Sequence, residues 1–159
     1  MTSNVRSIYD VGRMTTMGRA GKGPAVRATI GFATRDDGVG VAYARLRDER
    51  NGELVLREPF RCRPLPALRG RNVAYAALAA IVRRVLESDV RRVRFEVADP
   101  DLVADLAEHR AVPAPLTMPY VSLRCALNRF TEAAVVVAGA AARDLTARAR
   151  AEALLEVAA

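Results

Sequence analysis

The chain has 159 residues, of which 51% are hydrophobic and only 5% aromatic, and its formal net charge is +7. This length suits one compact domain with a core of Ala, Val and Leu, and no apolar run approaches the roughly 20 residues that a membrane span requires. The basic excess favours contact with phosphate groups. Because Lys22 is the only lysine, a genome that uses Arg for nearly every cation is an alternative source of the charge.

The first 25 residues combine Gly, Ser, Thr and scattered basic residues without any apolar periodicity. We expect residues 1–25 to form a mobile basic arm, which is either a phosphate-binding extension or a tail without function. One domain is expected to follow over residues 26–159. The N-terminus lacks the apolar segment of a signal peptide, so the expected location is the cytoplasm.

Alternating apolar and polar residues predict three strands near the start of this domain, over residues 27–34, 39–47 and 54–60. Residues 35–38 read Arg-Asp-Asp-Gly, and Asn51-Gly52 is a strong hairpin signal, so tight turns are expected between the strands. The domain is therefore predicted to begin with an antiparallel meander.

The second half of the chain alternates between helical and extended patterns. Helices are predicted over residues 72–86, 119–129 and 141–157, and strands over residues 91–97 and 131–138. A further helix is predicted to start at Pro100, because proline suits the first helical position and an apolar stripe follows it.

Asp99 lies at the junction between the strand over residues 91–97 and this helix. It continues the two-residue repeat of Val93, Phe95 and Val97, which alternate with charged residues, and would therefore lie on the same face of the strand. A carboxylate at a strand end beside a helix start either holds a metal ion or caps the helix, and a cap stabilises the fold by roughly 0.5–2 kcal/mol.

Four segments resemble the ribonuclease H-like family, in particular its ribonuclease HI-type domains. They are RNVAYAAL at residues 71–78, VADPDLVADL at residues 97–106, MPYVSLRCALNRF at residues 118–130 and DLTARARAEAL at residues 144–154. The resemblance implies an α/β fold with a five-stranded mixed sheet flanked by helices, in which two further strands follow the antiparallel meander. It also implies contact with nucleic acid, because members of this family cut RNA in RNA–DNA hybrids.

The chain departs from this family at the catalytic carboxylates, which hold two magnesium ions in active members. The family's first-strand Asp falls on Phe32, or on Gly31 if the register shifts by one. Its first-helix Glu falls on Ala74 and its terminal-helix Asp on Ala147, so only Asp99 is retained. We therefore expect a degenerate active site without a cofactor and without enzymatic activity.

The alternative is a ribonuclease with a relocated site, in which Asp36, Asp99 and Asp101 hold Mg²⁺ or Mn²⁺. Each of these acids also has a purely structural interpretation, which we favour. Asp36 lies in a turn, where Asp bonds the backbone, and Asp101 lies in a helix first turn, where negative charge suits the helix dipole.

Arginine is concentrated in the connection that leads into the first predicted helix. The cluster consists of Arg57, Arg61, Arg63, Arg69 and Arg71. Such side chains follow a nucleic-acid backbone through phosphate contacts without reading its sequence. The predicted function is non-catalytic contact with RNA, DNA or an RNA–DNA hybrid. The alternative is a protein-interaction or dimerisation module, marked by an exposed apolar patch on the Ala-rich final helix, so a homo-oligomer is one expected form.

Cys62 and Cys125 belong to no CxxC pattern and to no Cys/His cluster, so we expect two reduced and buried thiols. His109 is the only histidine, and we expect it on the surface.

Overall fold

The computed structural model describes the backbone of residues 25–158 and the side chains of residues 25–155. The basic arm expected over residues 1–25 therefore lies, except for its last residue, outside the described residues. No helix in the described part of the chain is both long and apolar enough to cross a membrane.

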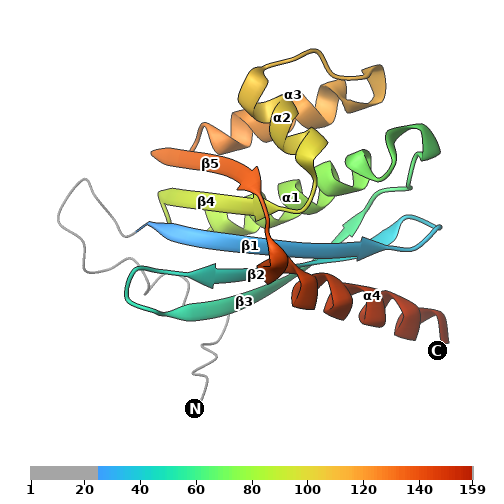
Figure 1. The fold of residues 1–159 in the computed structure, drawn as a ribbon, viewed down its shortest axis with the longest axis horizontal. Helices are drawn as coiled ribbons and strands as arrows, with labels where there is room; N and C mark the ends of the chain where they lie inside the picture. Colours follow the sequence, from blue (N-terminus) through green and yellow to red (C-terminus); the bar gives the residue numbers. More distant parts are fainter. Residues whose placement is uncertain (1–24, 159) are drawn as a thin grey trace.

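Among residues 25–158, five strands form one mixed sheet in the order β3-β2-β1-β4-β5 (Figure 1). The strands are β1 (Val26–Thr34), β2 (Val39–Arg47), β3 (Glu53–Arg61), β4 (Arg92–Val97) and β5 (Glu132–Val137). The first three pair antiparallel, whereas β4 pairs parallel with β1 and β5 pairs parallel with β4. The predicted mixed sheet with its antiparallel meander is confirmed.

The sheet is covered by the helices α1 (Arg71–Leu86), α2 (Pro100–Glu108), α3 (Thr117–Leu127) and α4 (Arg143–Ala158). α4 crosses one face over β1 and β2, and the other three helices lie on the opposite side (Figure 1). α3 begins before the predicted start at Pro119, because first-turn N–H groups need no intrahelical acceptor and proline is tolerated there. α4 begins later than predicted, since Ala140–Ala142 form a 3₁₀ turn first.

The main core lies between the sheet and α1. Because the strands are pleated, alternate residues such as Ile30 and Phe95 point to this face, and both are fully buried. Leu78 and Ile81 of α1 pack into the same cluster. Phe130 meets Phe95 edge to face, with the ring centroids 5.8 Å apart. This core holds α1 against β1, β2 and β3.

On the opposite face, α4 lies in close contact with β1. Leu145 and Ala149 of the helix are buried against Val41 of β2. A methyl group placed on Gly31 would lie 2.6 Å from the carbonyl carbon of Leu145 and still closer to the backbone nitrogen of Thr146. Glycine at position 31 therefore allows the helix backbone to reach the strand.

The expectation of two buried thiols is wrong for Cys125, which is exposed on α3. Leu123 is the one buried residue of that helix, so most of its positions, including 125, face outward. Cys62 is half-buried and accepts a hydrogen bond from the Asn72 amide at 3.3 Å. His109 is exposed, as expected.

Candidate functional site

Asp99 lies where β4 ends and α2 begins. Its backbone is extended, and its Oδ1 accepts a hydrogen bond from the Leu102 N–H at 3.0 Å. Pro100 follows at the start of the helix. Asp99 is therefore the N-cap of α2, as the helix-start pattern predicts, and one of its carboxylate oxygens is committed to the helix.

Phe32 is the residue of β1 that would face Asp99 if the parallel register of β1 and β4 continued by two residues. Ile30 pairs with Val97 in the parallel register of β1 and β4, and Phe32 and Asp99 each follow two residues later. Side chains two residues apart on a strand share a face, whereas Gly31 turns toward α4. The pleat therefore places Phe32, and not Gly31, on the face of the main core, against which its half-buried ring packs.

The two helical positions at which the sequence resemblance predicts family acids carry alanine. Ala74 is fully buried in α1, whereas Ala147 is exposed on α4. An acid does lie nearby in the first turn of α4, because Asp144 accepts a hydrogen bond from Arg45 of β2, with Oδ1 and Nη1 3.4 Å apart. The bonds from Arg45 lower the pKa of Asp144.

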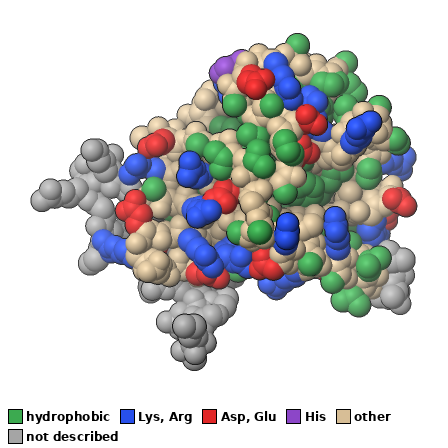
Figure 2. All heavy atoms as spheres, in the orientation of Figure 1, with side chains coloured by type: hydrophobic (Ala, Val, Ile, Leu, Met, Phe, Trp, Pro, Cys, Tyr) green, Lys and Arg blue, Asp and Glu red, His purple; other side chains and the backbone are tan. Residues whose placement is uncertain are grey.

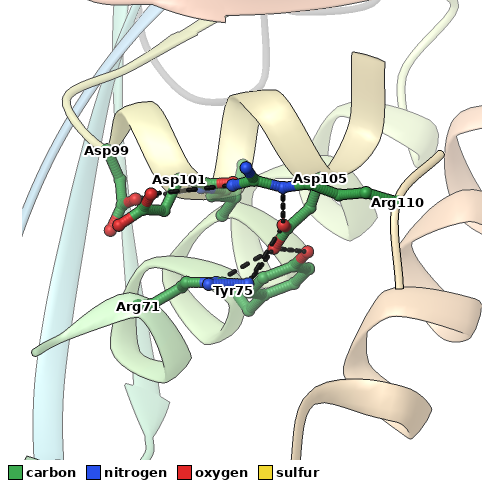
Figure 3. Close-up of polar contacts among 7 residues, drawn as sticks. Arg71, Tyr75, Asp99, Asp101, Asp105 and Arg110 are labelled. Atoms are coloured by element: carbon green, nitrogen blue, oxygen red, sulfur yellow. Dashed lines mark hydrogen bonds and ion pairs between the residues drawn. The ribbon is translucent and has the colours of Figure 1, made fainter. Parts of the chain in front are cut away.

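A buried carboxylate joins α2 to α1. Asp105 is 0% exposed, and Arg71 binds it bidentately, with Nε–Oδ2 and Nη2–Oδ1 distances of 3.0 Å each. Arg110 donates from Nε to Oδ1 at 2.8 Å, and the Tyr75 hydroxyl donates to Oδ2 at 2.9 Å (Figure 3). We refer to these four residues as the Asp105 cluster.

The sequence of α2 indicates a buried acid at Asp105, which the sequence analysis did not identify as a site residue. Asp105 falls between Leu102 and Leu106 on the apolar side of the helix, and an acid on a buried face requires a partner. Its partner Arg71 lies 34 positions away, so no local pattern identifies it. Burial and the bond to Asp105 raise the pKa of Tyr75, which keeps this hydroxyl a neutral donor.

The acids around Asp99 do not fit a pair of divalent cations. Such ions need several carboxylates that converge without other partners. Both oxygens of Asp105 accept bonds from guanidinium groups, and Nη2 of Arg110 lies 3.6 Å from Oδ1 of the exposed Asp101. Positive groups in these places oppose the binding of a cation. Within the described residues, no group of three or more His, Cys, Asp or Glu side chains is placed to hold a metal ion.

Asp36 lies in the turn between β1 and β2, beside an open cavity of about 700 Å³. The cavity is lined by Ala33, Thr34, Arg35, Asp36, Asp37, Arg150, Ala153 and Leu154. Asp99 and Asp101 do not line it, so the structure does not bring the three acids of the relocated site into one cavity. Hydrogen bonds from Arg35 hold the pKa of Asp37 at about 2.

The arginines of the predicted nucleic-acid-binding cluster fall into two groups. Arg57 pairs with Glu152 of α4, with Nε and Oε1 2.6 Å apart, and Arg71 belongs to the Asp105 cluster. Arg61, Arg63 and Arg69 are exposed, and none of them forms an ion pair with another residue of the described chain. Two of the five guanidinium groups are therefore occupied within the protein, and three face solvent.

Other arginines are interleaved with acids. Figure 2 shows Lys and Arg side chains across the lower half of the visible face, with Asp and Glu side chains between them. Pairs on the α4 side of the sheet include Arg45–Asp144, Arg47–Glu53 and Arg92–Glu132. The basic excess is therefore not gathered into one continuous patch on this face.

α4 exposes the apolar patch that the interaction-module alternative predicts. Ala147, Ala151, Leu154 and Leu155 are exposed, with the two leucines at 72% and 71%. Their spacing of three and four residues places them on one outward side of the helix. We call these four residues the α4 stripe, and hydrophobic side chains are visible at the lower right of Figure 2, where α4 ends.

No protein-family model matches this chain, and no curated protein sequence does either. Solved structures are similar to it. The crystal structure of RNase H1 from the halophilic archaeon Halobacterium salinarum NRC-1 matches with a TM-score of 0.66 and 16% sequence identity, covering 83% of this chain and 98% of that chain. The N-terminal RNase H domain of rv2228c from Mycobacterium tuberculosis matches with a TM-score of 0.61 and 13% identity, over 79% and 95% of the two chains.

LC11-RNase H1 in complex with an RNA/DNA hybrid is also similar, with a TM-score of 0.56 and 14% identity over 81% of this chain and 99% of that chain. At such identities the likeness shows the fold. The chain has the ribonuclease H-like fold that the four sequence segments predict.

Proposed function

We propose that this ribonuclease H-like domain contacts the phosphate backbone of RNA, DNA or an RNA–DNA hybrid without cleaving it. The contact is made by Arg61, Arg63 and Arg69. The observation that carries the proposal is the exposure of these three guanidinium groups at the end of β3 and on the connection to α1, without an ion-pair partner among residues 25–155. A similar structure, that of LC11-RNase H1, contains an RNA/DNA hybrid, which supports nucleic acid as the partner class.

The start of α1 adds to this basic surface. Gly70 precedes the helix, no side chain caps its first turn, and no acid lies in that turn. Free N–H groups and the helix dipole favour a phosphate at such a position. Arg69, directly before Gly70, therefore lies beside a second source of positive potential. Arg57 and Arg71 are left out of the proposed contact because carboxylates of the protein already hold them.

The non-catalytic part of the proposal rests on what the neighbouring acids already do. Asp99 caps α2, Asp105 is saturated by its cluster, and Asp144 is bound by Arg45. Continuation of the parallel register beyond the Ile30–Val97 pair would bring Phe32, which has no carboxylate, opposite Asp99. We infer that the chain uses the ribonuclease H-like scaffold for binding, and that Asp99, Asp105 and Asp144 serve stability.

The test is binding to a labelled RNA–DNA hybrid, to duplex DNA and to duplex RNA at several salt concentrations. Bonds from arginine to phosphate predict that the logarithm of the affinity falls linearly with the logarithm of the salt concentration. On duplex DNA, the triple variant Arg61→Ala, Arg63→Ala, Arg69→Ala is expected to reduce this slope by up to about 0.9 for each phosphate that it no longer neutralises.

A matched control removes the same charge from the opposite end of the sheet. Arg83, Arg91 and Arg94 are exposed at the end of α1 and the start of β4, and their triple alanine variant should leave the slope nearly unchanged. Equal losses of affinity in the two triple variants would show that only net charge matters. Failure to bind any of the probes at about 50 mM salt would refute the proposal outright.

Cleavage is tested in the same samples by adding Mg²⁺ or Mn²⁺ to the hybrid. We expect the RNA strand to remain intact. Metal-dependent cleavage that disappears in Asp99→Asn would overturn the non-catalytic part of the proposal and leave the binding part standing, so the two parts are judged separately.

A further inference from the structure

We propose that two copies of this chain associate through the free edge of β5, which pairs antiparallel with β5 of the second copy and extends the sheet across both molecules. This proposal is independent of nucleic-acid binding. It rests on the backbone groups, the composition and the register of β5, and on a partly apolar groove beside the strand.

β5 is an edge strand whose outer backbone groups have no partner in the described chain, since it pairs with β4 alone. Glu132 N–H donates to Arg91 O at 3.2 Å and Ala138 N–H donates to Val97 O at 2.9 Å. In a parallel ladder, the N–H and C=O groups of every second residue point to the neighbouring strand on one side, and those of the residues between them point to the other side. The N–H and C=O groups of Ala133, Val135 and Val137 therefore point away from the sheet, where an added extended strand can bond all of them in place of water.

The two edges of the sheet differ in how they are protected. β3, at the far edge, reads ELVLREPFR, and its charged residues and Pro59 are the usual features that prevent strand addition. β5 reads EAAVVV, with one charge at its first position and no proline. None of its residues is buried, and Val137 is 51% exposed. Hydrophobic side chains gather over this strand in Figure 2.

The contrast between the edges also selects the symmetry of the pair. Pairing of β5 with β3 of another molecule would repeat without end and would place apolar residues against charges. Pairing of β5 with itself closes after two copies, because the same patch is used on both sides. A second copy is therefore the occupant that fits this edge.

The register follows from the outward groups. Antiparallel bonding pairs require outward residues to face each other. Among the axes that meet this condition, the one through Val135 pairs all three outward residues with one another and places Val135 opposite its own copy. Ala133 then lies opposite Val137, and Ala134 lies opposite Val136. Each small side chain meets a larger one, and Glu132 falls at the rim, opposite Ala138, far from the same charge in the second copy.

A groove of about 430 Å³ lies beside this edge, on the side of α2 and α3. Leu106, Leu127 and Phe130 line it together with Val135, and so do the polar side chains of Arg124, Asn128 and Thr131. Side chains on this face of the added strand would enter the groove and cover apolar surface that is now open. The groove therefore adds burial to the backbone bonds of the pair.

The first experiment measures the mass of the full chain by light scattering and sedimentation from about 1 μM to 1 mM, a range that covers moderate association constants. We expect a monomer–dimer equilibrium. Amide hydrogen exchange at low and high concentration then identifies the strand edge. Protection should rise with concentration at Ala133, Val135 and Val137, whereas Ala134 and Val136, whose N–H groups bond to β4, should change little.

Charge substitutions at the two-fold axis test the register. Val135→Lys and Val135→Glu each place like charges opposite each other, and each should weaken self-association at least about tenfold. An equal mixture of the two variants should recover the dimer, because opposite charges then meet. Recovery also demonstrates that both variants fold. Leu154→Lys, on the α4 stripe, is the matched control and should leave the dimer unchanged.

Three results would overturn the proposal. The first is a wild-type chain that stays monomeric up to about 1 mM. The second is a dimer abolished by Leu154→Lys but not by the Val135 variants, which would assign the interface to α4. The third is hydrogen exchange at Ala133, Val135 and Val137 that does not change with protein concentration. This measurement uses the wild-type chain, so it decides between the outcomes even if the Val135 variants fail to fold.

Discussion

Arg71 of α1 and Asp105 of α2 form a bidentate ion pair with two N···O distances of 3.0 Å, and the carboxylate is completely buried. The pair connects α1, which packs on the main core, to the helix that Asp99 caps. It therefore fixes the strand–Asp–helix junction relative to the core. The same pair occupies the Arg71 guanidinium group, which is why Arg71 is left out of the proposed nucleic-acid contact.

Removal of the buried charge should be costly. Asp105→Asn leaves the guanidinium groups of Arg71 and Arg110 without their counter-ion, and loss of one partner of a buried pair destabilises a protein by about 3 kcal/mol. Asp101→Asn is the control, since that carboxylate is 71% exposed and pairs only at 3.6 Å, and its effect should stay below about 1 kcal/mol. Urea denaturation measures both free energies of unfolding, and equal effects would contradict a structural role for the Asp105 cluster.

Asp99 should behave as a helix cap. Asp99→Ala removes the acceptor of the Leu102 N–H and should destabilise the fold by about 1 kcal/mol. Asp99→Ser keeps an oxygen at the N-cap position and should recover most of this stability. Thermal unfolding of the two variants without added metal gives the comparison. A serine variant as unstable as the alanine variant would show that the carboxylate does something other than capping.

Gly31 should be intolerant of a side chain. In Gly31→Ala the added methyl group would lie 2.6 Å from the Leu145 carbonyl carbon, so α4 must move, and overpacking of this kind costs about 1–3 kcal/mol. Gly139→Ala is the matched control, because an added methyl group there has no heavy atom within 4 Å. Equal stabilities of the two variants would refute the close approach of α4 to β1.

The docking of α4 should weaken in acid. A hydrogen bond from Arg57 lowers the pKa of Glu152 below its ordinary value of 4.5, and Tyr43 contributes a second bond. A lowered folded-state pKa gives stability that is complete above the unfolded value and is lost as the pH falls through the folded value. We therefore expect the melting temperature to decrease as the pH is lowered past about 4.5. The decrease should be less steep in Glu152→Gln.

Arg57→Gln should flatten the same pH profile, because Arg57 is the largest cause of the lowered pKa of Glu152. The profile is measured by circular dichroism melting between about pH 3 and 7, on either side of the ordinary carboxyl values. A wild-type profile that neither variant changes would show that Glu152 does not couple α4 to the sheet.

The main elements of the fold are predictable from local patterns. Alternation at Val93, Phe95 and Val97 predicts β4, and the Asp99-Pro100 pair predicts the start of α2. Both signals depend only on residues that are close together in the sequence. Helix starts are less predictable. Pro119 sits inside the first turn of α3 rather than at its beginning, since proline is tolerated at several positions there.

The features of the candidate site also differ in whether local sequence patterns predict them. The sequence by itself determines the scaffold, the cap at Asp99 and the concentration of arginine before α1. Only the tertiary structure decides which arginines face solvent. Arg57 and Arg71 meet carboxylates 95 and 34 positions away. Arg61, Arg63 and Arg69 form no ion pair with a described residue, although the charge of Arg61 is near enough to Asp37 to help lower the pKa of that carboxyl. A cation is available to a ligand only if packing brings no acid beside it, and packing depends on the whole chain.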